Sequence, residues 1–324
     1  MPHIYKMSTH SGFKTLVEYN SMAAGNVTAP ATNGYFGGGN DGAKISGINK
    51  IAFSNDARTS LAATLSTARD FLGAMANSGT AGYFGGGTDG ARISGIDKIT
   101  FPADTKTTIS ATLSTARDQL GGMANSGTAG YFAGGTDSGG RISGIDKITF
   151  SSDAKSTLAA TLTAAVSSSG NMANSGTAGY VAGGFTGAAN VSTIDKITFS
   201  SDAKSTLAAV LTSARRALTA MANSGTAGYF CGGFAAAATS GIDKITFSTD
   251  AKTTLAATLT SARYDSAAMA NSGTAGYIGG GEDSGGRISG IDKITFSADT
   301  KTTISATLST ARVGLAGMAD SGTL

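Results

Sequence analysis

A single segment repeats along the chain, and its period limits the possible folds more than any other feature. The copy at 75–87 reads Met-Ala-Asn-Ser-Gly-Thr-Ala-Gly-Tyr-Phe-Gly-Gly-Gly. The tyrosines that mark the six copies lie 48 or 49 residues apart; they are Tyr35, Tyr83, Tyr131, Tyr180, Tyr229 and Tyr277. A fixed period of this length is typical of solenoids, propellers and repeat arrays. We therefore expect one large repeat domain rather than two unrelated ones.

The composition favours short strands and tight turns over helices. The 324 residues include 47 glycines, 3 prolines and no tryptophan, and the only glutamates are Glu18 and Glu282. Strong helix formers other than Ala and Leu are therefore scarce, whereas Thr, Ser, Ile and Gly are common. The glycines recur at fixed positions inside apolar segments, so they do not form a low-complexity linker.

Charge, cysteine content and hydropathy exclude several classes of protein. The formal net charge is +3, but no run of Lys or Arg exists, so a nucleic-acid surface is not expected. Cys231 is the single cysteine, which precludes an intramolecular disulfide, and we expect it to be a small buried filler. No apolar run approaches the length of a membrane span, so no membrane insertion is expected. Residues 1–20 lack the features of a secretory signal.

Two regions are expected along the chain. Residues 1–31 stand apart from the repeats and contain both histidines, His3 and His10. Alternating polarity at 12–19 predicts a strand there, and a loop containing Pro30 follows. We expect residues 1–31 to be an N-terminal attachment segment or an extra strand, and residues 32–324 to form the repeat domain.

One repeat unit reads as a four-stranded antiparallel sheet. In the second copy we predict strands at 82–87, 93–101, 108–115 and 121–125, joined by polar turns and loops. Such a sheet of small side chains needs neighbours on both faces. Six sheets placed radially bury each other's faces, which predicts an all-β, six-bladed β-propeller of about 24 strands. A linear stack would need capping units, and the sequence shows no polar cap.

The two ends of the repeat region complement each other. The last copy stops after Met-Ala-Asp-Ser-Gly-Thr-Leu, and the first copy begins with the missing Gly-Tyr-Phe-Gly-Gly-Gly at 34–39. We therefore expect the C-terminal strand at 315–320 to pair beside Tyr35 and close the ring. A strand at 12–22 is an alternative occupant of the same edge.

The repeat resembles a known family. An apolar segment ending in Gly-Gly, an Ile-Asp-Lys-Ile-Thr-Phe strand, a turn and Leu-Ser-Thr-Ala-Arg are similar to the kelch repeat over nearly all of residues 32–324. Gly86, Gly87, Phe101 and Arg117 lie where a kelch unit carries them, whereas the characteristic Trp is missing and Thr107 lies near its position. The near-identical units also resemble kelch-like propellers of phage virion proteins of the tail-fibre or spike type. This resemblance implies a place in the phage particle; otherwise we expect a cytoplasmic protein.

Two tracts vary among the copies, whereas the rest of the unit recurs. The first tract follows the glycines, at 40–44, 88–92, 136–141, 185–190, 234–239 and 282–287. The second follows Ser-Thr-Ala-Arg, at 70–74, 118–122, 167–171, 216–220, 264–268 and 313–317. Because strand direction alternates in an antiparallel blade, both varied tracts should emerge on one end of the propeller and both recurring turns on the other.

The varied end is the predicted binding surface, since binding residues concentrate on loops held by a rigid scaffold. The candidate binding residues are Arg92, Arg141, Phe185, Arg216, Phe234, Tyr264 and Arg287. Acidic residues of the same loops are Asp89, Asp137 and Asp283. The alternative is that these surface loops drift freely because nothing constrains them.

No catalytic, metal or cofactor site is expected. The histidines lie outside the repeats and Cys231 is alone, so clustered metal ligands and His-dependent nucleophilic chemistry are lacking. The Asp and Arg that recur in nearly every copy, such as Asp97 and Arg117, suggest structural pairing or turn bonding, because a catalytic group is normally unique within a ring. The recurring methionines are expected to fill space between blades.

The leading hypothesis is therefore a non-enzymatic phage adhesin that binds a host surface glycan or protein through the varied end. Residues 1–31 would dock on the particle, and a homo-oligomer would add weak contacts together through multivalency. One alternative is a structural virion component that contacts another virion protein. A second alternative is a cellular kelch-type scaffold for protein interactions.

Overall fold

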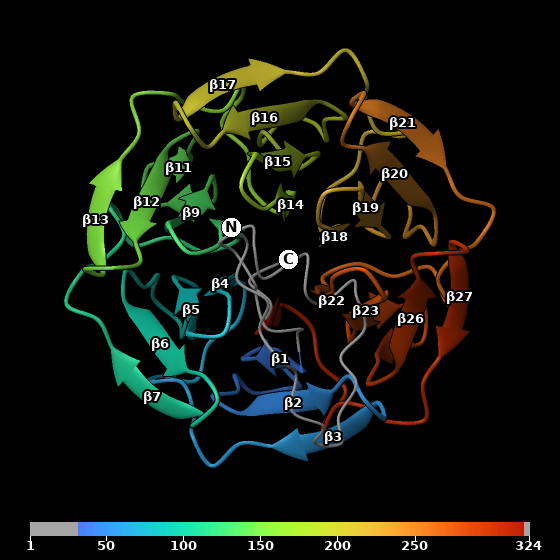
Figure 1. Ribbon diagram of the computed structural model, residues 1–324, viewed down its shortest axis with the longest axis horizontal. Helices are drawn as coiled ribbons and strands as arrows, with labels where there is room; N and C mark the ends of the chain where they lie inside the picture. Colours follow the sequence, from blue (N-terminus) through green and yellow to red (C-terminus); the bar gives the residue numbers. More distant parts are fainter. Residues whose placement is uncertain (1–31, 321–324) are drawn as a thin grey trace, which may run out of the picture.

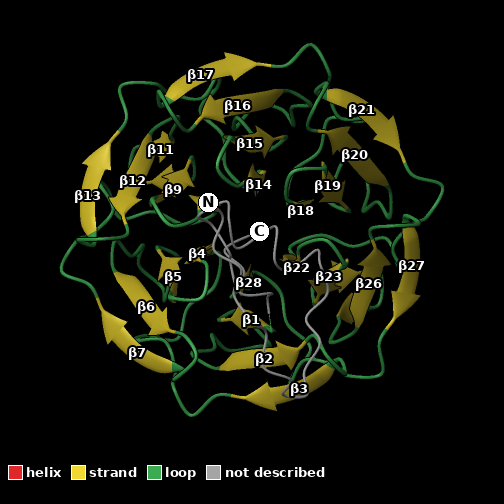
Figure 2. Ribbon diagram, viewed as in Figure 1, coloured by secondary structure: helices red, strands yellow, loops and turns green. Residues whose placement is uncertain are grey.

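The protein is a ring of six four-stranded antiparallel sheets, each forming one blade (Figure 1). The computed structural model describes residues 32–320. In this part of the chain strands alternate with loops, and no helix occurs (Figure 2). The prediction of an all-β, six-bladed propeller is confirmed. Residues 1–31, including the predicted strand at 12–22, lie outside the described residues.

Each blade uses one strand of each of four kinds, ordered from the axis outward. The innermost strands are β4 (Gly73–Asn77), β8 (Gly121–Asn125), β14 (Gly170–Asn174), β18 (Thr219–Asn223), β22 (Ala267–Asn271) and β28 (Ala316–Ala319). The second strands are β1 (Asn33–Gly37), β5 (Ala81–Gly85), β9 (Ala129–Ala133), β15 (Ala178–Ala182), β19 (Ala227–Cys231) and β23 (Ala275–Gly279).

The third and fourth strands complete the blades. The third strands are β2 (Ile48–Ala52), β6 (Ile96–Thr100), β12 (Ile145–Thr149), β16 (Ile194–Thr198), β20 (Ile242–Thr246) and β26 (Ile291–Thr295). The outermost strands are β3 (Ala57–Ser60), β7 (Thr105–Thr108), β13 (Ala154–Thr157), β17 (Ala203–Thr206), β21 (Ala251–Thr254) and β27 (Thr300–Thr303). Two segments that were expected to be loops form short hairpins. They are β10 (Thr136–Asp137) with β11 (Gly140–Arg141), and β24 (Glu282–Asp283) with β25 (Gly286–Arg287).

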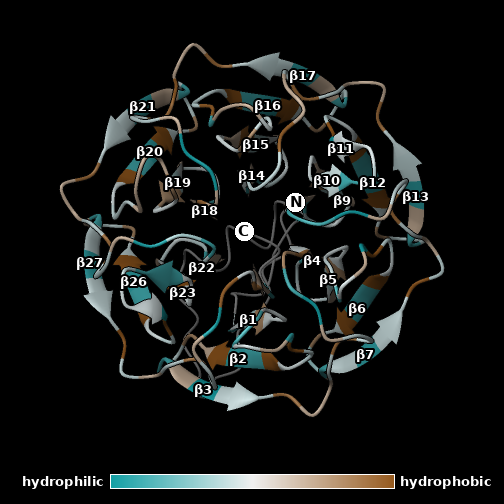
Figure 3. Cartoon of the chain, turned by 180° about the vertical axis from the view of Figure 1, so that it is seen from behind, coloured by the Kyte–Doolittle hydropathy of each residue, from teal (hydrophilic) through white to brown (hydrophobic). Residues whose placement is uncertain are grey.

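Burial falls from the axis to the rim, and the sequence of each strand follows it. The Ala-Gly-Tyr-Phe-Gly strand β5 is buried throughout, because neighbouring blades cover both its faces. In the Ile-Asp-Lys-Ile-Thr strands both Ile and the Asp are buried, whereas Lys and Thr are partly exposed, and Figure 3 shows teal and brown segments along β26. The Thr-Lys-Thr-Thr strand β7 is mostly exposed, and the outer strands are pale in Figure 3.

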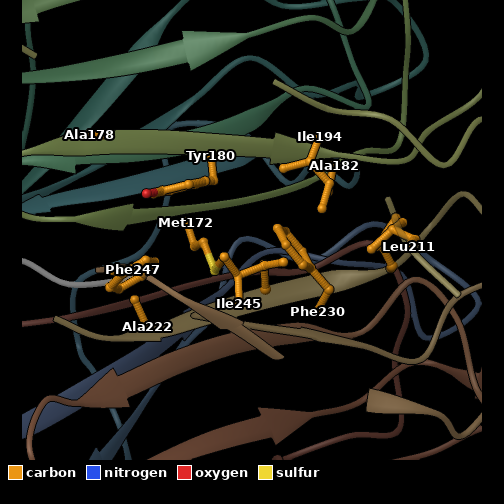
Figure 4. Close-up of a cluster of buried hydrophobic side chains, with 12 residues drawn as sticks. Met172, Ala178, Tyr180, Ala182, Ile194, Leu211, Ala222, Phe230, Ile245 and Phe247 are labelled. Carbon is orange, nitrogen blue, oxygen red and sulfur yellow. The ribbon is translucent and has the colours of Figure 1, made fainter. Parts of the chain in front are cut away.

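Methionines and glycines form the contacts between neighbouring blades. A Cβ placed on Gly130 would lie 2.1 Å from the Met75 sulfur, so only glycine leaves room for this methionine. The same contact recurs around the ring, and the pairs are Met123 with Gly179, Met172 with Gly228, Met221 with Gly276, Met269 with Gly34, and Met318 with Gly82. Figure 4 shows Met172 among side chains of two adjacent blades. The methionines therefore fill the space between blades, as predicted.

Each recurring tyrosine joins its blade to the next one. The Tyr83 hydroxyl donates to Oδ1 of Asp153 at 2.7 Å, and Lys98 Nζ donates to Oδ2 at 2.7 Å. Asp153 lies in the turn between the third and fourth strands of the next blade, at φ 54°. The Tyr83 ring stacks on Phe150 of that blade with centroids 5.3 Å apart. Burial, followed by the hydrogen bond to Asp153, raises the pKa of Tyr83, which stays a neutral donor.

The same junction occurs at all six blade boundaries. The other tyrosine–aspartate pairs are Tyr35 with Asp104, Tyr131 with Asp202, Tyr180 with Asp250, Tyr229 with Asp299, and Tyr277 with Asp56. The last pair joins the sixth blade to the first, so the junction is continuous around the ring.

The recurring arginines and aspartates are paired inside the fold. Arg117 Nη1 lies 3.0 Å from Asp146 Oδ2, and both side chains are fully buried. Asn49 replaces the aspartate in one copy and accepts from Arg312 at 3.2 Å. In another copy Val166 replaces the arginine. The Asp195 carboxylate of that copy accepts hydrogen bonds from Thr163 and Thr206 instead. The recurring arginine–aspartate pairs are therefore part of the structural framework.

The C-terminal strand closes the ring, as predicted. β28 pairs with β1, with Met318 opposite Tyr35. Asp320 stands where the other copies have asparagine. Its carboxylate accepts the Thr32 N–H at 2.8 Å, the Thr32 hydroxyl at 2.6 Å and the Asn33 N–H at 3.1 Å. An acceptor-only side chain therefore holds the beginning of the first blade.

The prediction for the outer strand was wrong in its position. In the second unit the strand is Thr105–Thr108, not 108–115, and the expected turn at 102–107 contains most of it. Leu113 is 3% exposed in the core between two blades, and its N–H donates to the Ser94 carbonyl. The Ser114 N–H donates to Asp146. The segment at 109–115 alternates in polarity because it crosses this boundary, not because it extends the sheet.

Candidate functional site

The two varied tracts meet on one end of the propeller. Single antiparallel bridges join the second tract of each unit to the first tract of the following one. The bridged pairs are Val313 with Asn40, Asp70 with Thr88, Asp118 with Thr136, Ser167 with Phe185, Arg216 with Phe234, and Tyr264 with Glu282. The loops that differ most between copies are therefore neighbours in space. We call this end of the molecule the varied face.

The recurring turns hold each other on the opposite end. The Ser126 N–H donates to the Ser175 hydroxyl at 3.0 Å, and the Gly127 N–H donates to Asn77 Oδ1 at 2.8 Å. Equivalent bonds join the next copies, for example from Gly176 to Asn125. Because these turn residues contact a neighbouring copy, the turn sequence is constrained in the copies that residues 32–320 include. The varied face carries no such requirement.

A ring of backbone hydrogen bonds surrounds the axis at the varied face. One residue of each second tract has φ between 51° and 63°, and its N–H donates to the equivalent residue of another blade at 2.7 to 2.9 Å. We call these the axial residues; they are Phe71, Gln119, Ser168, Ala217, Asp265 and Gly314. The backbone alone makes the ring, so the side chains at these positions are free to differ.

Five of the seven predicted binding residues form one continuous stack. The Arg141 guanidinium carbon lies 4.8 Å from the centre of the Phe185 ring. Arg216 lies between Phe185 and Phe234, 5.0 Å from each ring centre. Tyr264 meets Phe234 edge to face, with centroids 5.4 Å apart. We call this the arginine–aromatic stack. Each cation–aromatic contact contributes about 0.5–1 kcal/mol at an exposed site.

The stack borders a pocket displaced from the axis. The pocket has a volume of about 400 Å³ and is lined by Gln119, Arg141, Ser167, Ser168, Phe185, Arg216, Ala217, Phe234, Tyr264 and Asp265. Four of these are axial residues, so the pocket opens beside the ring of backbone hydrogen bonds. A smaller cavity of about 70 Å³ lies on the axis and touches all six axial residues. The larger pocket therefore lies to one side of the axis, although the six blades have nearly the same structure.

The cations of the varied face are neutralised to different extents, and Arg287, away from the pocket, has no ion pair among residues 32–320. Lys44 pairs with Asp70 at 3.0 Å, and Arg92 pairs with Asp118 at 3.2 Å. Among residues 32–320, Arg141 and Arg216 have no carboxylate within ion-pair distance. Arg216 instead donates to Asn190 Oδ1 at 3.2 Å, which orients its guanidinium between the two rings. Positive charge therefore remains available at the pocket.

One carboxyl group of the pocket has an altered pKa. Burial, followed by the nearby Glu282 carboxylate, raises the pKa of Asp265 from 3.8 to about 7, and Arg216 opposes this shift. Near neutral pH this side chain is a mixture of the acid and the carboxylate, so it can donate or accept a hydrogen bond. Burial and Glu282 also raise the pKa of Tyr264.

The two remaining predicted residues lie away from the pocket. Arg92 is exposed and forms the ion pair with Asp118. Arg287 is exposed on β25, where its backbone pairs with Glu282. The acidic loop residues accept hydrogen bonds from their own turns: Asp89 from Ala91, Asp137 from Gly139, and Asp283 from Gly285.

Sequence reasoning did not single out the polar side chains of the pocket. Gln119, Ser168 and Asp265 lie in the second varied tract, but they were not among the predicted binding residues. A signal was present, because six different residues occupy this one position in otherwise similar copies. Only the backbone ring shows that the position faces the axis in every blade.

A comparison with models of protein families finds no match, and a comparison with curated proteins finds no significant similarity. Within residues 32–320 no group of three or more His, Cys, Asp or Glu side chains is placed to hold a metal ion. The same part of the chain contains no helix long and apolar enough to cross a membrane.

Proposed function

We propose that this protein is a non-enzymatic binding protein that recognises its ligand with the pocket of the varied face. The observation that carries the proposal is the arginine–aromatic stack. Its residues come from three neighbouring units, whereas the equivalent cations of the first two units, Lys44 and Arg92, are ion-paired. Free drift of surface loops gives no reason for Arg141, Phe185, Arg216, Phe234 and Tyr264 to form one contiguous wall.

The resemblance to kelch-like propellers of phage tail-fibre proteins supplies the proposed setting. In that setting the varied face contacts a bacterial surface, and residues 1–31 attach the propeller to the particle. A rigid ring with one variable end suits such a role, because the ligand surface can change while the junctions between blades stay constant. Weak single contacts are summed when several copies are displayed together.

Binding to intact cells tests this function. The full-length protein is displayed on beads and incubated with a panel of bacterial strains, beside a variant with Phe185, Phe234 and Tyr264 changed to Ala. We expect the wild type to bind at least one strain and the variant to lose that binding. Because the three rings are partly buried, the variant's melting temperature is measured first, and Arg216→Ala serves as a second, less disruptive variant.

Two outcomes contradict the proposal. If both folded variants bind the same strains as the wild type, the ligand contacts another surface. If the displayed wild type binds no strain but captures a virion protein, the varied face has a structural role in the particle.

A further inference from the structure

The free charge at the pocket indicates which chemical group it accepts. Arg141 and Arg216 are held by stacking on Phe185 and Phe234, so little freedom is lost when they bind a ligand. Their planar guanidinium groups match a carboxylate or a phosphate through paired hydrogen bonds. Both arginines lack an ion-pair partner among the described residues, whereas Lys44 and Arg92 on the other half of the face have one.

The acidic groups beside the pocket favour a singly charged anion over a doubly charged one. Asp265 lines the pocket, and the Glu282 backbone bridges to Tyr264. A phosphate monoester carries close to two negative charges at neutral pH, so these carboxyl groups would repel it more strongly than a carboxylate. The combination of two arginines with nearby acids therefore suits a ligand that carries one carboxylate.

The rest of the lining suits a sugar ring. Gln119, Ser168 and Asp265 offer hydrogen-bond donors and acceptors in one part of the pocket, where hydroxyl groups can bind. Tyr264 and Phe234 provide aromatic surface for the apolar side of a ring. The volume of about 400 Å³ lies within the range of small-molecule sites, which is about 300–1,000 Å³.

We propose that the pocket binds a sugar unit bearing a carboxylate, such as a uronic or sialic acid residue of a surface glycan. Arg216 binds the carboxylate, Arg141 adds positive charge from the opposite face of Phe185, Gln119, Ser168 and Asp265 bind hydroxyl groups, and the aromatic rings pack against the sugar. This inference rests on the proposed function, because it names the ligand class of the same pocket.

Titration calorimetry of the full-length protein tests the inference. The probes are galacturonate, glucuronate and N-acetylneuraminate, each beside its methyl ester, which keeps the ring and removes the charge. We expect at least one acid to bind ten times more tightly than its ester. Arg216→Met and Arg141→Met each remove a charge while keeping apolar length. Arg216→Met should weaken binding of that acid at least tenfold, and Arg141→Met, which acts across the Phe185 ring, should weaken it by a smaller factor.

Arg92→Met is the matched control, since it removes an arginine from the same face outside the pocket. It should leave binding unchanged, and melting temperatures establish that all variants are folded. The inference is overturned if no acid binds, if the ester binds as tightly as the acid, or if Arg92→Met weakens binding as much as Arg216→Met. If cells are still bound through the aromatic residues in these cases, the binding function stands and only the ligand class is wrong.

Discussion

At the scale of single residues, differences between copies are matched across the boundary to the next blade. The last residue of the second strand packs against an apolar side chain of the following blade. Gly85 faces the Phe132 ring, and a Cβ on it would lie 2.6 Å from the ring. At the equivalent boundary Cys231 and Ile278 share one core cluster. Cys231 therefore fills the space that the smaller Ile278 leaves. Burial raises the pKa of its thiol to about 12, which keeps it protonated.

This pairing predicts the outcome of a double-mutant cycle. Cys231→Gly should lower the free energy of unfolding by about 1–3 kcal/mol, because it opens a cavity and adds backbone freedom. Ile278→Phe alone should cost about 1–3 kcal/mol through overpacking. The double variant recreates the Gly–Phe pair of other boundaries, so it should be more stable than the two single losses predict. Denaturant unfolding of all four proteins measures the coupling; simple additivity would contradict the pairing.

A second residue-scale prediction concerns Asp265 and pH. Its folded-state pKa is raised from 3.8 to about 7, because burial and the facing Glu282 and Asp70 carboxylates outweigh Arg216. A raised carboxyl pKa means that the folded state binds the proton more tightly than the unfolded chain does. The stability it contributes is therefore present below about pH 4 and is lost as the pH rises through 7.

Asp265→Asn removes this dependence and tolerates the left-handed backbone, since asparagine adopts positive φ readily. Relative to the wild type, the variant should gain at least about 1 kcal/mol of stability between pH 4 and pH 8, as one pKa unit corresponds to about 1.4 kcal/mol. Thermal melting at both pH values measures the difference. A difference that stays constant with pH would show that Asp265 has an ordinary pKa.

At the scale of elements, the blades depend on short turns that reach into the next blade. Asp153 adopts φ 54° and receives hydrogen bonds from Tyr83 and Lys98 of the preceding blade. The turn therefore determines both the path of the outermost strand and the spacing between two sheets. Six such turns recur, so the rigid geometry of the varied face originates at the opposite end of the blades.

Two replacements of Asp153 separate the contribution of its ion pair from those of the Tyr83 hydrogen bond and the turn conformation. Asp153→Asn keeps an acceptor for Tyr83 and the preference for positive φ, and it should cost about 1 kcal/mol or less, because the lost ion pair is partly exposed. Asp153→Ala also loses the hydrogen bond to the buried Tyr83 hydroxyl and strains the backbone. It should cost about 2 kcal/mol or more. Equal losses in urea unfolding would mean that neither the hydroxyl bond nor the turn conformation contributes.

At the scale of the whole molecule, the ring is closed by a strand from the far end of the chain. β28 pairs with β1, and Met318 packs under Gly82 as the other methionines pack under their glycines. The axial residue Gly314 completes the ring of backbone hydrogen bonds through Phe71 and Asp265. The closing strand thus makes the same contacts to the second blade as the continuous blades make to their neighbours.

Because the contacts match, we expect the closing strand and an internal strand to contribute equally to the free energy of unfolding. Met318→Ala and Met123→Ala remove the same side chain from the closing strand and from an internal strand, and a Cβ added to each glycine partner would lie 2.2 Å from the sulfur. Both should lower the free energy of unfolding by about 2–5 kcal/mol. Calorimetric or denaturant unfolding compares them. A much smaller effect of Met318→Ala would mean that the ring opens at β28 in solution.

Most of the fold, but not the position of the outer strand, could be predicted from the sequence. The period, the glycines and the complementary ends predicted the propeller, its closure and the varied face, because these follow from repetition and from the alternation of strand direction. The position of the outer strand could not be predicted. Residues 109–115 alternate like a strand, yet the Leu113 N–H bonds to Ser94 beside β6 and the Ser114 N–H bonds to Asp146 of the next blade.

The candidate site was also predicted in part. The sequence by itself determined which loops vary and that they share one end, and it named the five residues of the arginine–aromatic stack. Only the tertiary structure decided that Arg92 is neutralised by Asp118, that Arg216 stays free between two rings, and that Asp265 lines the same pocket. The physical reason is that charge pairing and burial depend on contacts between different blades, and the spacing within one repeat does not encode these contacts.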